Sequence, residues 1–157
     1  MDTSKTVKGK IMRGFEFSLP MSLLKARESV MKKFMPHLRK HDLSSPQWCV
    51  LRILYVENNV SMSNLSIRCN LLIPSLSRIV RDLEKRQLLS RKTSTKDKRL
   101  SIISLSKSGE ALVEVIAPES EENHRHIGEI IGEKELATLT ELLDKLVDKL
   151  NENDDCT

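Results

Sequence analysis

The chain has 157 residues, enough to bury one hydrophobic core, and its formal net charge of +4 is too small to indicate a polyanionic partner by itself. Aromatic residues make up only 3%, too few for a surface on which single-stranded bases stack. No apolar run approaches the ~18 residues of a membrane span, and no signal peptide is visible. Three cysteines without CxxC spacing fit a reducing cytoplasm and argue against a zinc site. We therefore expect a cytoplasmic protein without a metal or other cofactor.

The N-terminal part is predicted to hold a polar, basic segment followed by a long helix. We expect residues 1–14 to fray or to wrap a partner subunit. Apolar residues recur at helical spacing from about Leu19 to Lys40, and Pro20 is permitted in the first turn of such a helix. Pro36 lies inside this pattern and removes a backbone hydrogen bond. It predicts a kink or a break near Met35.

The second predicted helix begins after Ser44. Ser44 and Gln47 are three residues apart and form a capping box, in which each side chain satisfies a backbone N–H of the first turn. The helix carries Trp48 and runs towards Val56, and the pair Asn58-Asn59 ends it.

A third, short helix is predicted from Met62 to Cys69, capped by Ser61. We expect Leu65 and the run from Ile67 to Cys69 to face the core. This helix would support the one that follows it.

The stretch from Leu71 to Arg86 predicts a helix with one apolar and one polar face. Its apolar stripe recurs at helical spacing, and Pro74 suits its first turn. The stripe consists of Leu76, Ile79, Val80 and Leu83. The opposite face consists of Ser75, Ser77, Arg78 and Arg81. A helix with such a face can enter a major groove, where serine and arginine reach bases and phosphates.

A basic hairpin is predicted directly behind this helix. The runs 88–92 and 100–105 favour β-structure, and they flank a polar tip. From Arg91 to Arg99 the cations are Arg91, Lys92, Lys96, Lys98 and Arg99, against one acid, Asp97. A charge run alone usually marks a solvated surface. Behind a helix with a basic face, it predicts the wing of a winged helix-turn-helix.

Two further helices are predicted at the C-terminal end. Ser106 caps one that runs to roughly Ile127, with a bend at Pro118, and Gly132 or its neighbours separate it from a last helix over 133–150. Leucines of this last helix alternate at spacings of three and four, which is a coiled-coil seam. They are Leu136, Leu139, Leu143, Leu146 and Leu150. The seam predicts a homodimer, and packing of the seam within one chain is the alternative.

Three motifs in this order resemble the MarR/SlyA family of bacterial transcription regulators. The segment from Leu83 to Arg91 is similar to the end of the family's recognition helix, Asp97-Lys98-Arg99 to its Asp-x-Arg wing signature, and the segment from Leu105 to Gly109 to the start of its next helix. Gln87 departs from the pattern, because the family usually has glycine at this helix end, where a left-handed residue is favoured.

The resemblance implies a mainly α fold with a small β-hairpin wing. Residues 41–106 would form a winged helix-turn-helix DNA-binding domain, and residues 1–40 and 107–157 a helical dimerisation region. A two-fold dimer would read a pseudo-palindromic site in double-stranded DNA. The residues expected to contact DNA are Ser61, Ser63, Pro74, Ser75, Ser77, Arg78, Arg81, Lys92, Lys96, Lys98 and Arg99. Asp97 would pair with Arg99 and hold the wing in shape.

The segments 19–28 and 43–54 are similar to the HpaR-type branch of the family, the repressors of homoprotocatechuate breakdown. This likeness implies a repressor of an aromatic-compound catabolic operon, released by a small aromatic acid of the hydroxycinnamate, hydroxybenzoate or hydroxyphenylacetate class. Trp48 and Arg52 lie one helical turn apart, so an indole wall and a carboxylate clamp share a face. Arg27 and His37 could complete a pocket between the dimerisation region and the DNA-binding domain.

Each of these effector residues also has a structural interpretation. Trp48 can belong to the core, and Arg52 can form a salt bridge with Glu28 or Glu57. Arg27 can pair with Glu28 beside it, and His37 can lie at a helix end near the dipole.

Two other functions remain open at this level. One is a regulator switched by oxidation of Cys49 or Cys69, although the cysteine near the start of the first helix that some family members use is missing here. The other is a helical adaptor that does not bind DNA. We expect no enzyme, because no Ser-His-Asp order, paired carboxylates, Gly-rich phosphate loop or metal-ligand cluster stands out.

Overall fold

The computed structural model describes residues 5–7, 10–12, 14, 18–93 and 101–154. The backbone contacts divide the chain into two compact units, residues 1–116 and 117–157. The predicted wing tip falls on residues 94–100, so Lys96, Asp97, Lys98 and Arg99 lie outside the described residues.

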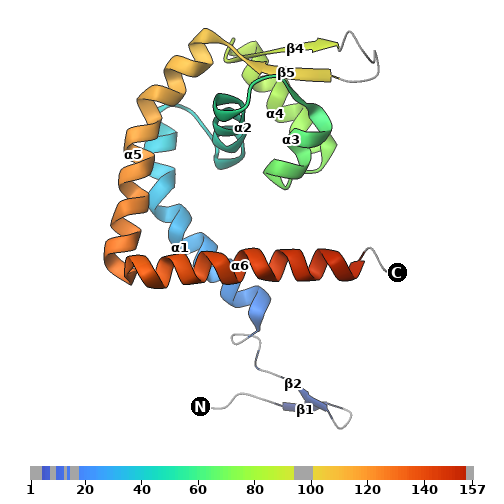
Figure 1. Cartoon of the computed structure of the whole chain (residues 1–157), viewed down its shortest axis with the longest axis vertical. Helices are drawn as coiled ribbons and strands as arrows, with labels where there is room; N and C mark the ends of the chain where they lie inside the picture. Colours follow the sequence, from blue (N-terminus) through green and yellow to red (C-terminus); the bar gives the residue numbers. More distant parts are fainter. Residues whose placement is uncertain (1–4, 8–9, 13, 15–17, 94–100, 155–157) are drawn as a thin grey trace. The chain divides into compact units, whose positions relative to one another are not determined.

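The N-terminal part of the first unit holds two short strands and a long helix (Figure 1). Strands β1 (Lys5–Val7) and β2 (Lys10–Met12) pair antiparallel within the segment that was expected to fray. Helix α1 (Leu19–Lys40) has Pro20 in its first turn and continues through Pro36 to Lys40, so of the predicted kink or break near Met35 the break is wrong.

Helix α2 (Ser45–Val56) begins with the predicted capping box. The Gln47 N–H donates to the Ser44 hydroxyl at 3.4 Å, and the Ser44 N–H donates to the Gln47 side-chain oxygen at 2.8 Å. The helix ends at Val56, before the asparagine pair, as predicted. Asn58 has a further role, because its side-chain oxygen accepts a 2.9 Å hydrogen bond from the Leu105 N–H and joins this turn to the sheet.

A three-stranded antiparallel sheet with the order β3-β5-β4 contains the predicted hairpin. Strands β4 (Leu89–Thr93) and β5 (Ser101–Leu105) lie side by side, with Leu89 opposite Leu105 (Figure 1). Strand β3 (Val60–Ser61) pairs with the other edge of β5 and was not predicted, because a two-residue strand leaves no periodic pattern in the sequence.

Helices α3 (Met62–Cys69) and α4 (Ile73–Lys85) complete the helix-turn-helix. The Ser61 hydroxyl caps α3 as predicted, accepting a 3.2 Å hydrogen bond from the Asn64 N–H. Leu65 is fully buried, but Ile67 is 76% exposed and Arg68 is exposed, so the predicted inward placement of these two residues is wrong. Two residues along a helix turn a side chain to nearly the opposite face.

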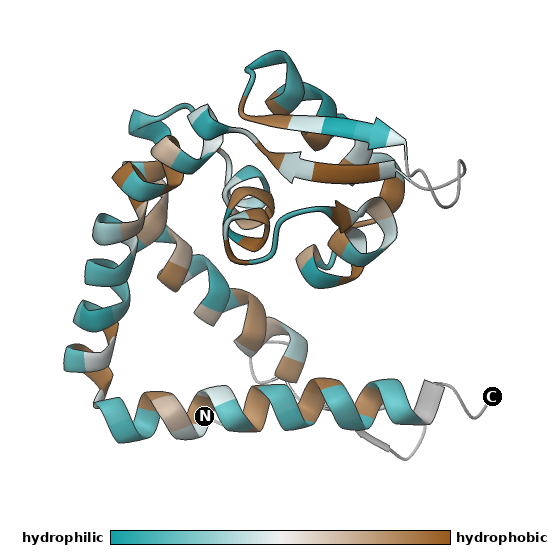
Figure 2. Ribbon diagram, turned by 45° about the horizontal axis from the view of Figure 1, so that its top comes forward, coloured by the Kyte–Doolittle hydropathy of each residue, from teal (hydrophilic) through white to brown (hydrophobic). Residues whose placement is uncertain are grey.

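The core of the first unit is formed by the end of α1, the inner faces of α2, α3 and α4, the middle of β5 and the first part of α5 (Lys107–Ile131). Figure 2 shows the middle of β5 as an apolar stretch of ribbon. The fully buried aliphatic side chains are Leu38, Val50, Leu51, Leu54, Leu65, Leu76, Val80, Leu83, Ile103 and Ile116.

Helix α5 crosses from the first unit into the second, where α6 (Glu133–Asp154) follows it. The Ser106 hydroxyl caps α5, accepting a 3.0 Å hydrogen bond from the Gly109 N–H. The helix passes Pro118 and ends at Ile131, beyond the predicted end near Ile127. Gly132, at φ 104°, separates it from α6, as predicted.

Of the leucines in the α6 seam, Leu139, Leu143 and Leu150 are exposed, and Leu136 and Leu146 are half-buried. Figure 2 shows apolar positions recurring along this helix, and Leu143 is 36% and Leu150 57% exposed. Within the described residues, no helix combines the length and the apolar character that crossing a membrane would require.

Candidate functional site

Helix α4 has one buried and one polar face, as the sequence predicted. Leu76, Val80 and Leu83 are buried and Ile79 is half-buried. On the other side, Pro74, Ser75, Arg78 and Arg81 are exposed and Ser77 is half-buried. The N-cap residue is Leu72, whose side chain cannot accept a hydrogen bond from the first turn. The first-turn N–H groups of α4 are therefore suited to an external acceptor such as a phosphate oxygen.

Two side-chain contacts attach α4 to the α1–α2 junction. The Arg86 guanidinium donates to the carbonyl oxygens of Asp42 and His41, at 2.8 and 3.0 Å. The Gln47 amide donates to an Asp82 carboxylate oxygen at 2.7 Å. These residues position the helix, and sequence reasoning missed them, because no local spacing links residues about 40 positions apart.

The turn that ends α4 has a strained backbone at Gln87, the position where the family usually has glycine. Gln87 has φ 59°, in the left-handed region, and the Leu88 N–H donates to the Leu83 carbonyl at 3.0 Å. The Ser106 hydroxyl donates to the Gln87 carbonyl oxygen at 2.7 Å. One serine therefore caps α5 and also holds the turn between α4 and the wing.

The described part of the wing carries two of the predicted cations, Arg91 and Lys92, on β4. The Arg91 guanidinium donates to the Ser101 hydroxyl across the hairpin, with Nε and Nη2 at 3.1 and 2.9 Å. Lys92 is exposed. On α3, Ser61 has its hydroxyl in the helix cap, and Ser63 is exposed.

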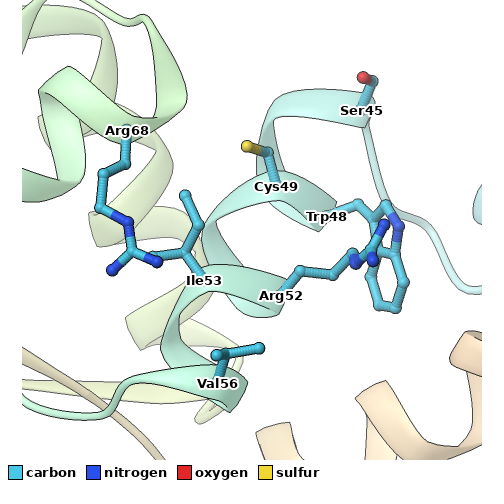
Figure 3. A pocket seen from close by; sticks show the side chains of 7 residues that line it. All are labelled: Ser45, Trp48, Cys49, Arg52, Ile53, Val56 and Arg68. Carbon is cyan, nitrogen blue, oxygen red and sulfur yellow. The ribbon is translucent and has the colours of Figure 1, made fainter. Parts of the chain in front are cut away.

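A pocket of about 410 Å³ opens between α2 and α3 (Figure 3). Figure 3 shows the Arg52 side chain beside the Trp48 ring, with the Arg52 Cζ 6.0 Å from the ring centroid. Trp48 is only 6% exposed, so its indole belongs to the core and also forms the pocket wall. The lining residues are Ser45, Trp48, Cys49, Arg52, Ile53, Val56 and Arg68. The pocket therefore combines an aromatic wall, aliphatic side chains and two guanidinium groups.

The two other predicted effector residues lie elsewhere. Arg27 forms an exposed ion pair with Glu28 at 2.9 Å. His37 is buried on α1 against Phe34, with 6.0 Å between the ring centroids. The structure thus brings together Trp48 and Arg52, and it does not bring Arg27 or His37 into the α2–α3 pocket.

Arg68 is the pocket residue that sequence reasoning missed. It projects from α3 and forms a 2.6 Å ion pair with Glu57. Glu28 and Glu57 are the two carboxylates expected as alternative partners of Arg52. Glu28 pairs with Arg27, and Glu57 pairs with Arg68. Only the packing of α3 against α2 brings Arg68 to the pocket, so no local pattern could have found it.

Cys49 lies on α2 and Cys69 is the last residue of α3, and both are free thiols. The hydrogen bond from the Cys69 thiol lowers the pKa of Cys49 to about 7, and the positive charges of Arg52 and Arg68 act in the same direction, against the effect of burial. The same hydrogen bond, together with burial, raises the pKa of Cys69. Within the described parts of the chain, no group of three or more His, Cys, Asp or Glu side chains is placed to hold a metal ion.

The MarR family model matches residues 43–101, which contain α2, the helix-turn-helix and β4. The homoprotocatechuate degradative operon repressor of Escherichia coli is 34% identical over 130 residues, covering 83% of this chain and 88% of that protein.

Two solved structures are similar over most of their length. The crystal structure of transcriptional regulator PA4135 is 34% identical, covers 83% of this chain and 96% of its own, and has a TM-score of 0.79. NadR in complex with 4-hydroxyphenylacetate is 30% identical, covers 86% of this chain and 96% of its own, and has a TM-score of 0.75. With a repressor 34% identical over most of both chains and a matching helix-turn-helix and wing, this chain belongs to the MarR family of winged-helix transcriptional regulators.

Proposed function

We propose that this protein represses an aromatic-compound catabolic operon and is released from its operator when a small aromatic acid binds in the α2–α3 pocket. The observation that carries the proposal is the Arg52 guanidinium over the Trp48 ring in a pocket of about 410 Å³. That volume lies in the usual range of small-molecule sites, roughly 300–1,000 Å³.

The pocket chemistry fits a flat ring that bears a carboxylate. Indole and aliphatic surfaces favour the ring of the ligand, and a guanidinium pairs with a carboxylate through charge-assisted hydrogen bonds. Arg52 and Arg68 both line the pocket, from different helices, and make it favourable for a negatively charged ligand. The similarity to the E. coli repressor and to NadR, crystallised with 4-hydroxyphenylacetate, supports a hydroxylated aromatic acid.

The proposed DNA interface is the exposed face of α4 together with the wing. Ser75, Arg78 and Arg81 would reach bases and phosphates in the major groove, and the first turn of α4 would bind a phosphate through its N–H groups. Lys92 would contact the DNA backbone. Lys96, Lys98 and Arg99 would lie along the DNA backbone or in the flanking minor groove.

We propose that two copies of the chain act together on a pseudo-palindromic operator. The exposed apolar seam of α6 supports a homodimer, because a leucine stripe of this kind is stable only against a partner. Two recognition helices related by a two-fold axis read half-sites about one turn of DNA apart. The protein would act where the DNA is, in the cytoplasm.

The acid would act by changing the spacing of the two recognition helices. A ligand bound between α2 and α3 would favour one position of α3, the helix that precedes α4. The two α4 helices of the dimer would then be spaced so that they no longer fit successive major grooves. The ligand must bind the two states with different affinity. A coupling of about 1–3 kcal/mol would lower operator affinity about 5- to 150-fold.

The test is fluorescence anisotropy with the DNA upstream of the protein's own gene. We expect tight, salt-sensitive binding that a hydroxylated aromatic acid releases and its carboxamide does not. Tight binding that no acid of the panel disturbs would overturn the effector, but not the DNA-binding role. Weak binding without sequence preference would overturn the operator and favour the helical adaptor.

A further inference from the structure

Two large apolar side chains lie exposed at the N-terminal tip of α4. Leu72 is the N-cap residue and is 78% exposed, and Ile73 is the first helical residue and is 45% exposed. Neither belongs to the core, which α4 reaches through Leu76, Val80 and Leu83. Serine, threonine, aspartate or asparagine at the N-cap would stabilise the helix, and leucine does not. The stability of the fold therefore does not explain why two aliphatic residues stand here.

The turn before α4 holds this tip in one position. Asn70, the C-cap residue of α3, has a left-handed backbone at φ 51°. The Leu71 N–H donates to the Ser66 carbonyl oxygen at 3.0 Å, and the Ser66 hydroxyl donates to the Leu71 carbonyl oxygen. The Leu76 N–H donates to the Leu72 carbonyl oxygen at 3.0 Å, which starts α4. The two apolar side chains are therefore presented from a preorganised backbone.

The residues beside the tip indicate which partner covers it. Pro74, Ser75 and Arg78 follow on α4 and are exposed. Helix α4 is the second helix of the helix-turn-helix, the helix whose N-terminal residues reach base edges in the major groove. Serine and arginine find hydrogen-bond acceptors there, on bases and phosphates. Duplex DNA therefore suits the polar residues beside the tip, and it must also accommodate Leu72 and Ile73.

Thymine is the base that presents an apolar group in the major groove. Its C5-methyl group lies at the edge of the groove, where an aliphatic side chain can contact it. Cytosine presents an amino donor in the groove, and an aliphatic side chain packed against that donor would leave it without a hydrogen-bond partner. Apolar side chains at the tip of α4 therefore favour thymine and disfavour a G·C pair at the same position.

We propose that Leu72 and Ile73 bind thymine methyl groups in the major groove and so require A·T pairs at fixed positions of each operator half-site. This inference rests on the proposed function, in which α4 meets the operator, and it names bases that α4 reads. Ser75 and Arg78 make the hydrogen bonds to neighbouring bases or phosphates. The apolar tip adds sequence selectivity to the helix, because contacts to phosphates alone are the same on every duplex.

The test begins with duplexes that the full-length protein selects from a random-sequence pool. The duplex bound most tightly is then remade with deoxyuridine in place of each thymidine in turn, because uracil pairs as thymine does and lacks only the C5-methyl group. Fluorescence anisotropy gives the Kd of each duplex. At fixed thymines of each half-site we expect uracil to raise the Kd about fourfold, the effect of losing one buried methyl group.

Truncated variants assign the methyl contacts to the tip. Leu72→Ala and Ile73→Ala remove exposed carbon atoms, so neither should impair folding. Each should weaken binding of the thymine duplex about fourfold or more, and should reduce the uracil effect to less than about 1.5-fold at the thymine it contacts. Arg78→Ala should weaken binding and keep the full uracil effect, because it removes a polar contact. Val115→Ala, which truncates an exposed aliphatic residue of α5, should behave as the wild type.

The outcomes separate this inference from the proposed function. A wild-type protein that binds every uracil duplex as tightly as the thymine duplex would overturn the methyl contacts and leave DNA binding in place. If Leu72→Ala and Ile73→Ala both kept the full uracil effect, the methyl contacts would belong to other residues and the role of the tip would be overturned. If the protein enriched no sequence from the pool, the proposed function and this inference would both fail.

Discussion

The Arg52 guanidinium lies over the Trp48 indole ring, with 6.0 Å between Cζ and the ring centroid. The two residues are one turn apart on α2, so the helix itself brings them to the same face. The contact orients the arginine at the pocket wall through a cation–π interaction. A ligand carboxylate that binds Arg52 therefore places its ring near the indole.

Replacing Arg52 with alanine should weaken acid binding and leave operator binding intact. Loss of a charge-assisted hydrogen bond costs about 1.5–3 kcal/mol, which corresponds to an increase of about 10- to 150-fold in the Kd of the acid. Quenching of Trp48 fluorescence measures this directly, because Trp48 is the single tryptophan of the chain. Arg27→Ala, outside the pocket, is the control, and an equal loss in both variants would place the acid elsewhere.

The exposed arginines of α4 should dominate affinity for the operator. Arg78→Ala and Arg81→Ala are each expected to lower it by about tenfold or more, since each removes a base or phosphate contact. Where the lost partner is a phosphate, the slope of log affinity against log salt should fall by roughly one. Arg39→Ala, an exposed cation on α1, serves as the reference. Unchanged affinity in both α4 variants would exclude this face from the interface.

Gln87→Gly should stabilise the protein. Gln87 has φ 59°, a conformation that costs other residues about 1–3 kcal/mol and glycine little. After the greater freedom of glycine in the unfolded chain is subtracted, we expect a gain of about 0.5–1 kcal/mol, or a few degrees in Tm. Gln87→Ala retains the Cβ and should show no such gain. Equal thermal shifts in the two variants would mean that backbone strain is not the cause.

Two glycines of α5 should respond to alanine in opposite directions. A Cβ on Gly109 would lie 2.1 Å from the Leu88 carbonyl oxygen and 2.7 Å from a Leu105 methyl carbon, so the junction of α5 and the wing must shift, at a cost of about 1–3 kcal/mol. A Cβ on Gly128 would meet no atom closer than 3.7 Å, and alanine there should gain up to about 1 kcal/mol of helix propensity. Urea unfolding compares the two, and a stable Gly109→Ala protein would contradict the close packing.

The apolar seam of α6 should hold the dimer together. Leu143→Lys places a charge in the seam and is expected to produce monomers that bind an operator half-site weakly. Glu141→Lys introduces the same side chain on roughly the opposite side of the helix and should remain dimeric. Light scattering coupled to size exclusion gives the mass. If both variants remained dimeric, the α6 seam would not be the dimer interface.

Local spacing in the sequence was sufficient to predict most helices and their caps. Ser44 with Gln47, Ser61 and Ser106 cap the predicted helices, because a cap involves atoms only a few residues apart. The stripe of α4 and the shared face of Trp48 and Arg52 followed from helical periodicity for the same reason. The departure at Gln87 also indicated the left-handed backbone found there.

Contacts between distant segments were decided only by the tertiary structure. Arg68 comes to the pocket because α3 packs against α2. The burial of His37, away from the pocket, likewise depends on how α1 packs. Periodicity determines which side chains share a face, but it carries no information on which face of another element they meet. The amphipathic elements were therefore determined by the sequence alone, while the composition of the α2–α3 site depended on how the core assembled.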